Sequence, residues 1–196
     1  MNIGKGRESA IRISLLDVMY GVVLAYGFGF FDQASMTIDY LRSAITLIRQ
    51  IEMADIRAIH SIDSQIFGSE AYPIAFLRQA YELYRQTFFV ASVGGAIIGY
   101  CLGTPLAANR HKGWILSLVV SSNYRRQGYG ARLLSKTLEA LLEIGCNEVL
   151  LSVQPDNNIA RALFQKHAFK TIQIDSEYFG PGHPREIMRV LLRKQT

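Results

Sequence analysis

Cysteine, histidine and tryptophan are scarce in this chain of 196 residues. It contains two cysteines, four histidines and one tryptophan. Cys101 lies in an apolar, strand-like run and Cys146 follows a helical segment, so the sequence indicates no disulfide framework and favours a reducing compartment. The histidines are scattered without the spacing of metal ligands, and we therefore expect no metal.

A strong charge of one sign is also missing. The 21 basic and 16 acidic residues leave a net charge of +5, and no long basic run or aromatic-basic patch occurs. We therefore expect no nucleic acid partner, whereas a mild positive excess fits an anionic cofactor or an acidic partner. With 49% hydrophobic residues, the chain can bury a sizeable core, and its length suits one domain plus an extension.

The extension is the N-terminal hydrophobic part, residues 1–43, which we separate from a domain at 44–196. Residues 13–31 are nearly all apolar, and a run of this length can span a bilayer. Asp17 and several glycines within the run weaken that interpretation, and the basic residues before it would place the domain outside. Three hypotheses stay open: a membrane or interfacial anchor, an extra helix packed on the domain, or an upstream translation artefact with Met36 as the true start.

The rest of the chain predicts an α/β (α+β) domain. Gly94-Gly95 separates two apolar runs and indicates a tight hairpin. From apolar periodicity and turn residues, we expect strands at 44–49, 87–93, 96–102, 113–120, 147–153, 169–175 and 186–192, and helices at 54–67, about 73–84, 131–144 and 158–167.

The most informative stretch is the basic glycine turn at 125–130, with the sequence Arg-Arg-Gln-Gly-Tyr-Gly, between an expected strand and an expected helix. Backbone N–H groups at a helix start lack intrahelical acceptors, and the helix dipole and the arginines add positive charge. Glycines allow the backbone to approach an anion. The turn therefore predicts a phosphate or pyrophosphate site. It lacks the Gly-Lys-Ser/Thr of a Walker loop, and Leu133 replaces the third glycine of a dinucleotide fingerprint.

Two motifs resemble the signatures of the GNAT (Gcn5-related) N-acetyltransferases. The turn at 125–130 resembles their Arg/Gln-x-x-Gly-x-Gly/Ala signature, which grips the pyrophosphate of coenzyme A. The segment from Asn157 to Phe169 resembles their second signature, Asn-x-x-Ala-x-x-Leu-Tyr-x-x-x-Gly-Phe, with Phe164 in place of the tyrosine and Ala168 in place of the glycine. The resemblance covers about 44–192 and implies the GNAT fold, a mixed, mostly antiparallel central sheet flanked by helices.

The resemblance implies acetyl-CoA as cosubstrate. Backbone groups of the central strand would meet the pantetheine arm and the carbonyl, and the basic turn would hold the diphosphate. Asn157 would bind the pantetheine arm or cap its helix, and Phe164 would pack near the cofactor without the hydroxyl that usually protonates the leaving thiolate. The implied cofactor-binding residues are Leu118, Val119, Val120, Arg125, Arg126, Gln127, Gly128, Tyr129, Gly130, Ala131, Asn157 and Phe164.

A finer resemblance concerns the substrate side. The segments Glu-Ala-Tyr-Pro at 70–73 and Tyr-Phe-Gly-Pro-Gly at 178–182 are similar to two loops of archaeal N-terminal protein acetyltransferases and RimI-type enzymes. This similarity implies that Glu70 orients or deprotonates the amine and that Tyr178 contacts the peptide or donates a proton. The chain departs from that subgroup at Trp114, where its members carry histidine, and at Ser152, where they carry glutamate.

The resemblance implies an enzyme that moves an acetyl group from acetyl-CoA to a primary amine by direct attack in a ternary complex. The expected acceptor is an N-terminal or lysine amine of a peptide or protein. Two alternatives stay open: a small-molecule amine as acceptor, and a non-catalytic module that binds acyl-CoA. We expect a cytoplasmic protein, with membrane association through residues 13–31 if that segment is an anchor.

Overall fold

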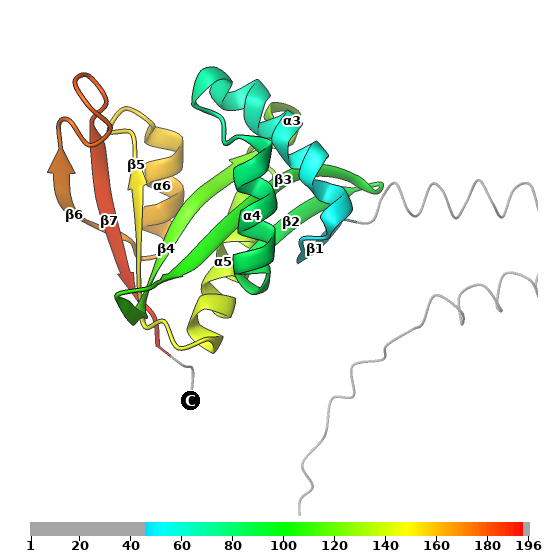
Figure 1. The fold of residues 1–196 in the computed structure, drawn as a ribbon. Coiled ribbons are helices and arrows are strands. Elements are labelled where there is room, and N and C mark those ends of the chain that lie inside the picture. Colours follow the sequence, from blue (N-terminus) through cyan, green and yellow to red (C-terminus); the bar gives the residue numbers. More distant parts are fainter. Residues whose placement is uncertain (1–45, 194–196) are drawn as a thin grey trace, which may run out of the picture. The chain divides into compact units, whose positions relative to one another are not determined.

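The computed structural model describes residues 46–193, which form one seven-stranded sheet with helices on both faces (Figure 1). The sheet has the order β1-β2-β3-β4-β5-β7-β6, and every neighbouring pair is antiparallel except β4–β5. The strands are β1 (Thr46–Gln50), β2 (Phe88–Val93), β3 (Ala96–Leu106), β4 (Asn109–Val120), β5 (Glu148–Val153), β6 (Lys170–Asp175) and β7 (Arg185–Leu191). The helices are α3 (Ile56–Phe67), α4 (Ile74–Tyr84), α5 (Tyr129–Glu143) and α6 (Asn158–Lys166).

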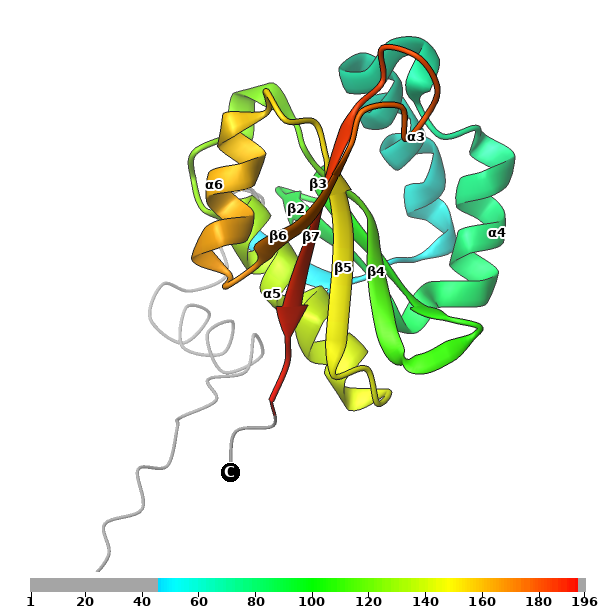
Figure 2. The same ribbon diagram turned by 90° about the vertical axis from the view of Figure 1, so that its left-hand side faces the viewer.

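The helices bury apolar side chains against opposite faces of the sheet (Figures 1 and 2). On one face, the buried positions of α5, such as Leu134 and Leu141, pack with Phe164 of α6 in one core cluster. On the other face, Ile59 of α3 and Leu77 of α4 belong to a second cluster. The helical spacing of these apolar residues explains both arrangements, because it places them on one side of each helix.

The sheet opens between β4 and β5. Their parallel ladder ends at the pair Ile115–Leu151, although β4 continues to Val120. At the same point, the β3–β4 register shifts so that Leu116 is an extra residue, which is a β-bulge. The bulge bends β4 away from β5, and the β5-facing edge of β4 therefore has no strand partner beyond Ile115.

The expected order of elements agrees with the structure, and most boundaries lie within two residues. The main correction concerns the β3–β4 hairpin, which is longer than expected. β3 continues to Leu106, β4 already begins at Asn109, and the turn between them lies at 107–108. Pro105 and the exposed, polar residues 109–111 explain why the sequence does not indicate this part of the hairpin, because the segment lacks apolar alternation.

The hypotheses about residues 1–43, including an anchor at 13–31, lie outside the described residues, as does the start of the first expected strand. Among residues 46–193, none of the helices combines the length and the apolar content that crossing a bilayer requires.

Candidate active site

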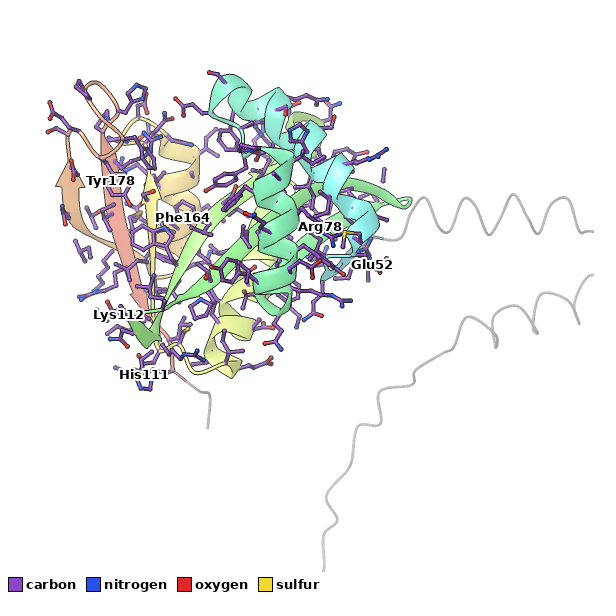
Figure 3. All side chains as sticks on the ribbon, viewed as in Figure 1. Glu52, Arg78, His111, Lys112, Phe164 and Tyr178 are labelled. Carbon is purple, nitrogen blue, oxygen red and sulfur yellow. The ribbon has the colours of Figure 1, made fainter. Side chains whose placement is uncertain are left out.

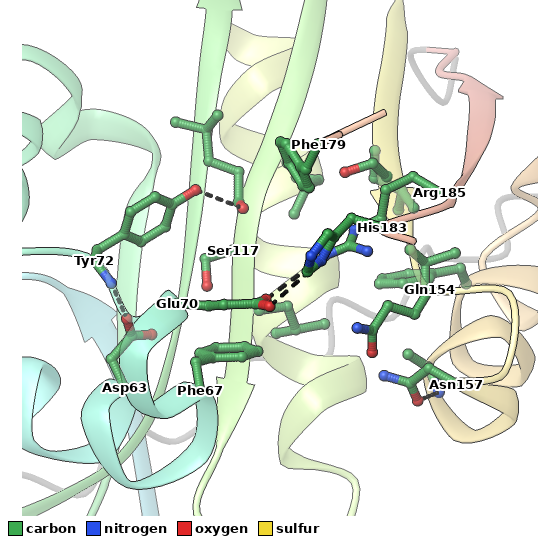
Figure 4. A pocket seen from close by; sticks show the side chains of 18 residues that line it. Asp63, Phe67, Glu70, Tyr72, Ser117, Gln154, Asn157, Phe179, His183 and Arg185 are labelled. Carbon is green, nitrogen blue, oxygen red and sulfur yellow. Dashed lines mark hydrogen bonds and ion pairs between the residues drawn. The ribbon is translucent and has the colours of Figure 1, made fainter. Parts of the chain in front are cut away.

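A cavity of about 560 Å³ lies where β4 and β5 separate (Figure 4). Its walls come from the end of α3 and the following loop, from β4 and β5, from α6, and from the connection between β6 and β7. The bulge of β4 and the facing edges of β4 and β5, which do not pair with each other beyond Ile115 and Leu151, thus provide a cavity that is lined by residues from both faces of the sheet.

One side of the cavity contains a buried hydrogen-bond chain. The carboxylate of Asp63, which is fully buried, accepts hydrogen bonds from the Tyr72 backbone N–H at 2.7 Å and from the Tyr100 hydroxyl. Ser117 Oγ donates to the Tyr100 hydroxyl at 3.0 Å, and the Tyr72 hydroxyl donates to the carbonyl of Leu116 at 3.3 Å. Because Asp63 holds the backbone of Tyr72, the chain anchors the loop at 70–73 to α3.

Burial raises the pKa of both tyrosines of this group, and the nearby Asp63 carboxylate raises each further. The hydroxyls of Tyr72 and Tyr100 therefore keep their protons at neutral pH and remain hydrogen-bond donors. Asp63 consequently stays paired with a neutral donor and not with a second charge.

The mouth of the cavity brings together one carboxylate and two nitrogen side chains from distant parts of the chain (Figure 4). Glu70 Oε1 lies 3.8 Å from His183 Nδ1, and Glu70 Oε2 lies 3.8 Å from Arg185 Nη2. The Arg185 guanidinium also stacks over the ring of Phe179 at 4.8 Å. These contacts link the loop after α3 to the connection between β6 and β7.

Phe164 and Asn157 line the cavity from the α6 side. Phe164 is 6% exposed, and its ring centre lies 5.8 Å from that of Phe169. Asn157 Oδ1 accepts a hydrogen bond from the Ala160 backbone N–H at 3.1 Å, so Asn157 caps α6 and also faces the cavity. Ala168 has a φ of 63°, which explains why a glycine is usual at its place in the motif.

The basic glycine turn connects β4 to α5. Gly128 is the N-cap of α5 with a φ of 84°, and it provides no side chain to cap the first turn. A Cβ atom added to Gly128 would meet nothing within 4 Å, so the space beside the turn is open. Arg125 Nε donates to the carbonyl of Val120 at 3.1 Å, which fixes the turn to the end of β4, and Arg126 is exposed. This arrangement can receive an anion at the helix start.

The structure distributes the expected site residues over two places. Glu70, Leu118, Asn157 and Phe164 line the cavity. The turn from Arg125 to Ala131 lies outside the lining, and so do Val119 and Val120. The side chain of Val119 packs in the core cluster of α3 and α4.

Tyr178 also lies outside the lining, in the connection between β6 and β7 (Figure 3). Its ring packs edge-on against Phe179 at 4.7 Å. Of the two positions that depart from the archaeal pattern, Ser152 lines the cavity and Trp114 does not.

Sequence reasoning missed Asp63, Ser117, His183 and Arg185 as parts of the cavity. Asp63 alone left a signal, because a charged residue stands there on the apolar side of α3 between Ile62 and Ile66. The others depend on distant segments that come together only in the fold.

Within residues 46–193, no three His, Cys, Asp or Glu side chains come together as a possible metal site. Cys101 and Cys146 are free and buried, and burial raises the pKa of the Cys101 thiol to about 12. Neither thiol lines the cavity, so the available chemistry belongs to the hydroxyl, carboxylate, imidazole and guanidinium groups named above.

Comparison with known proteins gives a consistent result. Residues 53–169 match the model of the acetyltransferase (GNAT) family. The N-alpha-acetyltransferase of Sulfurisphaera tokodaii is 30% identical over 151 residues, which cover 72% of this chain and 90% of that protein. In fold, the chain is similar to Ard1 from Thermoplasma volcanium, with a TM-score of 0.70, 24% identity, and coverage of 76% of this chain and 99% of the other. It is also similar to a chain of the NatC complex bound to Gag peptide and CoA, with a TM-score of 0.68, 18% identity, and coverage of 76% and 99%.

Proposed function

Since the chain belongs to the acetyltransferase (GNAT) family and is an acetyl-CoA-dependent N-acetyltransferase, we propose that its acceptor is the α-amino group at the N-terminus of a polypeptide. The observation that carries this proposal is the cavity at the β4–β5 opening, which is lined by both substrate-side loops. A relative named N-alpha-acetyltransferase, of which the chain covers 90%, supports the same acceptor.

On the cofactor side, the proposal assigns the diphosphate of acetyl-CoA to the turn from Arg125 to Ala131. The open space beside Gly128 and the uncapped start of α5 support this assignment. The pantetheine arm would follow the unpaired edge of β4 at Leu118, Val119 and Val120 toward the cavity, where Asn157 and Phe164 lie. Backbone groups at this edge are suited to polarise the thioester carbonyl.

On the acceptor side, Glu70 is proposed to orient the ammonium group and to take its proton before the amine attacks. Its position at the cavity mouth supports this role. Tyr178 is proposed to contact the peptide, because its ring packs on Phe179, which lines the same mouth. Phe164 cannot donate a proton, so the thiolate is proposed to leave with help from water or from Tyr178.

The lining does not favour a cationic small-molecule acceptor such as a polyamine. Asp63 is already paired with two donors, and Glu70 lies near both His183 and Arg185. The cavity therefore has no surplus of negative charge to attract several ammonium groups. The proposed domain, 44–196, contains every part of this site. The proposed location is the cytoplasm, where acetyl-CoA is available.

The test is acetyl transfer by the full chain to three pools: peptides with free N-termini, lysine peptides with blocked N-termini, and small amines. We expect transfer to the free N-termini, and we expect Arg126→Glu to abolish it by repelling the diphosphate. Arg110→Glu, a charge reversal on the exposed start of β4, is the control and should leave transfer unchanged. Transfer only to lysine or to small amines would refute the proposed acceptor, and binding of acetyl-CoA without any turnover would favour a regulatory module.

A further inference from the structure

Arg185 is a buried cation at the mouth of the cavity with few hydrogen bonds. Its side chain is only 10% exposed, and Nη1 donates to the carbonyl of Pro184 at 2.9 Å. No other hydrogen bond of its guanidinium occurs within residues 46–193, although this group has five N–H donors. Its nearest carboxylate oxygen, in Glu70, lies at 3.8 Å, which is beyond hydrogen-bond distance. The guanidinium stacks on the ring of Phe179 but is otherwise desolvated, and most of its N–H donors lack an acceptor among the described residues.

Glu70 is loosely held as well. It stands 3.8 Å from both His183 and Arg185, and its side chain is 53% exposed. Figure 4 shows the three groups facing one another across the mouth. A ligand that carries an ammonium and a carboxylate close together could replace these long contacts by short ones on both sides.

We propose that Arg185 selects polypeptides whose first residue is aspartate or glutamate: Glu70 receives the α-ammonium group and Arg185 receives the side-chain carboxylate. This inference rests on the proposed function, because it specifies the acceptor of the same site. It makes Arg185 a specificity-determining residue and not a catalytic one.

The spacing of the groups favours the first residue over the second. Glu70 and Arg185 are 3.8 Å apart, so their two ligands must also be near neighbours. In an acidic first residue, the α-nitrogen and the carboxylate are separated by only a few bonds, about 3–5 Å. A carboxylate on the second residue lies a full peptide unit further from the α-nitrogen, so it is less well placed to reach Arg185 while the α-ammonium group contacts Glu70.

The energetics favour exchange of the contacts. A guanidinium and a carboxylate at hydrogen-bond distance form a two-pronged, charge-assisted pair, which the present 3.8 Å contact does not provide. Since Arg185 is already buried, little further desolvation of the guanidinium is needed. A neutral isostere such as glutamine fills the same space but leaves the guanidinium incompletely paired, so the site should distinguish the two.

The experiment measures kcat/KM of the full chain for peptides that differ only in a first residue of Glu, Gln, Lys or Ala. We expect the wild type to prefer Glu over Gln by about tenfold, which is typical of one charge-assisted hydrogen-bonded pair. Arg185→Gln should reduce this ratio to about one, and Arg185→Glu should reverse the charge preference toward Lys. Each ratio is taken within one variant, so a loss of folded protein does not affect it.

Arg189→Gln is the matched control, because Arg189 lies on the same strand but is exposed and outside the cavity lining. It should retain the wild-type ratio. Equal rates for Glu and Gln peptides in the wild type, or an unchanged ratio in Arg185→Gln, would overturn the inference and leave the proposed function intact. Faster acetylation of free glutamate than of the Glu peptide would overturn the polypeptide acceptor of the proposed function, since a free amino acid carries the same two charges. Failure of every peptide would overturn the proposed function itself.

Discussion

At the scale of single residues, Phe164 differs by one hydroxyl group from the tyrosine that is usual at its place in the motif. Its ring is buried beside Phe169 and lines the cavity, as a tyrosine ring would, but it has no proton to donate. A general acid contributes about 10²-fold or more to a transfer reaction. The packing role and the chemical role of this position are therefore separable by experiment.

We predict that Phe164→Tyr keeps or raises kcat, up to about tenfold, because the added hydroxyl restores a possible acid beside the cavity. Steady-state turnover at saturating acetyl-CoA measures the effect. Phe169→Tyr serves as the control: it adds a hydroxyl to the neighbouring buried ring, outside the lining, and should not raise kcat. A tenfold fall in kcat for Phe164→Tyr would mean that the site cannot accommodate the hydroxyl.

The two motif departures at Trp114 and Ser152 have different consequences in the structure. Ser152 lines the cavity and leaves it with a hydroxyl in place of a carboxylate, whereas Trp114 lies outside the lining. Glu70 and Asp63 are the carboxylates of the lining, and Asp63 is engaged in two hydrogen bonds. Among the lining side chains, Glu70 is therefore the best placed to accept a proton from an amine.

At the scale of elements, the start of α5 and the bulge of β4 are the two parts of the proposed cofactor site. Gly128 has a left-handed backbone, and Gly145, just after the end of α5, has a φ of 101°. A Cβ on either glycine would meet nothing within 4 Å. The two positions thus share a positive φ, at which an L side chain is strained, but differ in their distance from the proposed diphosphate site.

We predict that Gly128→Val weakens acetyl-CoA binding by more than tenfold, because the side chain would project into the space that the diphosphate is proposed to enter. Gly145→Val should leave the affinity unchanged, although both variants lose about 1–2 kcal/mol of stability from the positive φ. Calorimetric titration with acetyl-CoA measures the affinity. Equal affinity of Gly128→Val and the wild type would refute the diphosphate assignment.

At the scale of the whole molecule, α3 is joined to the sheet by a chain of hydrogen bonds as well as by apolar packing. Hydrogen bonds connect Asp63 of α3 and Ser117 of β4 to Tyr100 of β3, which belongs to the second core cluster. Because burial and Asp63 raise the pKa of Tyr100, the folded protein keeps this proton to a higher pH than the unfolded chain does. Folding stability is consequently linked to pH in the alkaline range.

We predict that the stabilisation from Tyr100 is complete below about pH 10, the ordinary pKa of tyrosine, and is lost as the pH rises further. Tyr100→Phe should cost about 1–3 kcal/mol at neutral pH, because Asp63 loses a donor, but its stability should fall less steeply at alkaline pH. Urea unfolding at several pH values measures both effects. Ser117→Ala is the control: it retains the Tyr100 hydroxyl, so its free energy of unfolding should change with pH as steeply as that of the wild type. An equally steep change in Tyr100→Phe and in the wild type would contradict the linkage.

The sequence by itself determined the order of helices and strands and the hairpin at Gly94-Gly95. These features are local, because apolar periodicity and turn residues act over a few neighbouring positions. Acetyl-CoA as cosubstrate followed from the resemblance of the motifs at 125–130 and 157–169 to the GNAT signatures, which are also local in the chain. Only the tertiary structure decided that the β4–β3 register shifts at Leu116, and that Glu70, His183 and Arg185 meet at one mouth. Strand pairing and loop packing over long sequence distances set those positions, and no periodicity within a single segment records them.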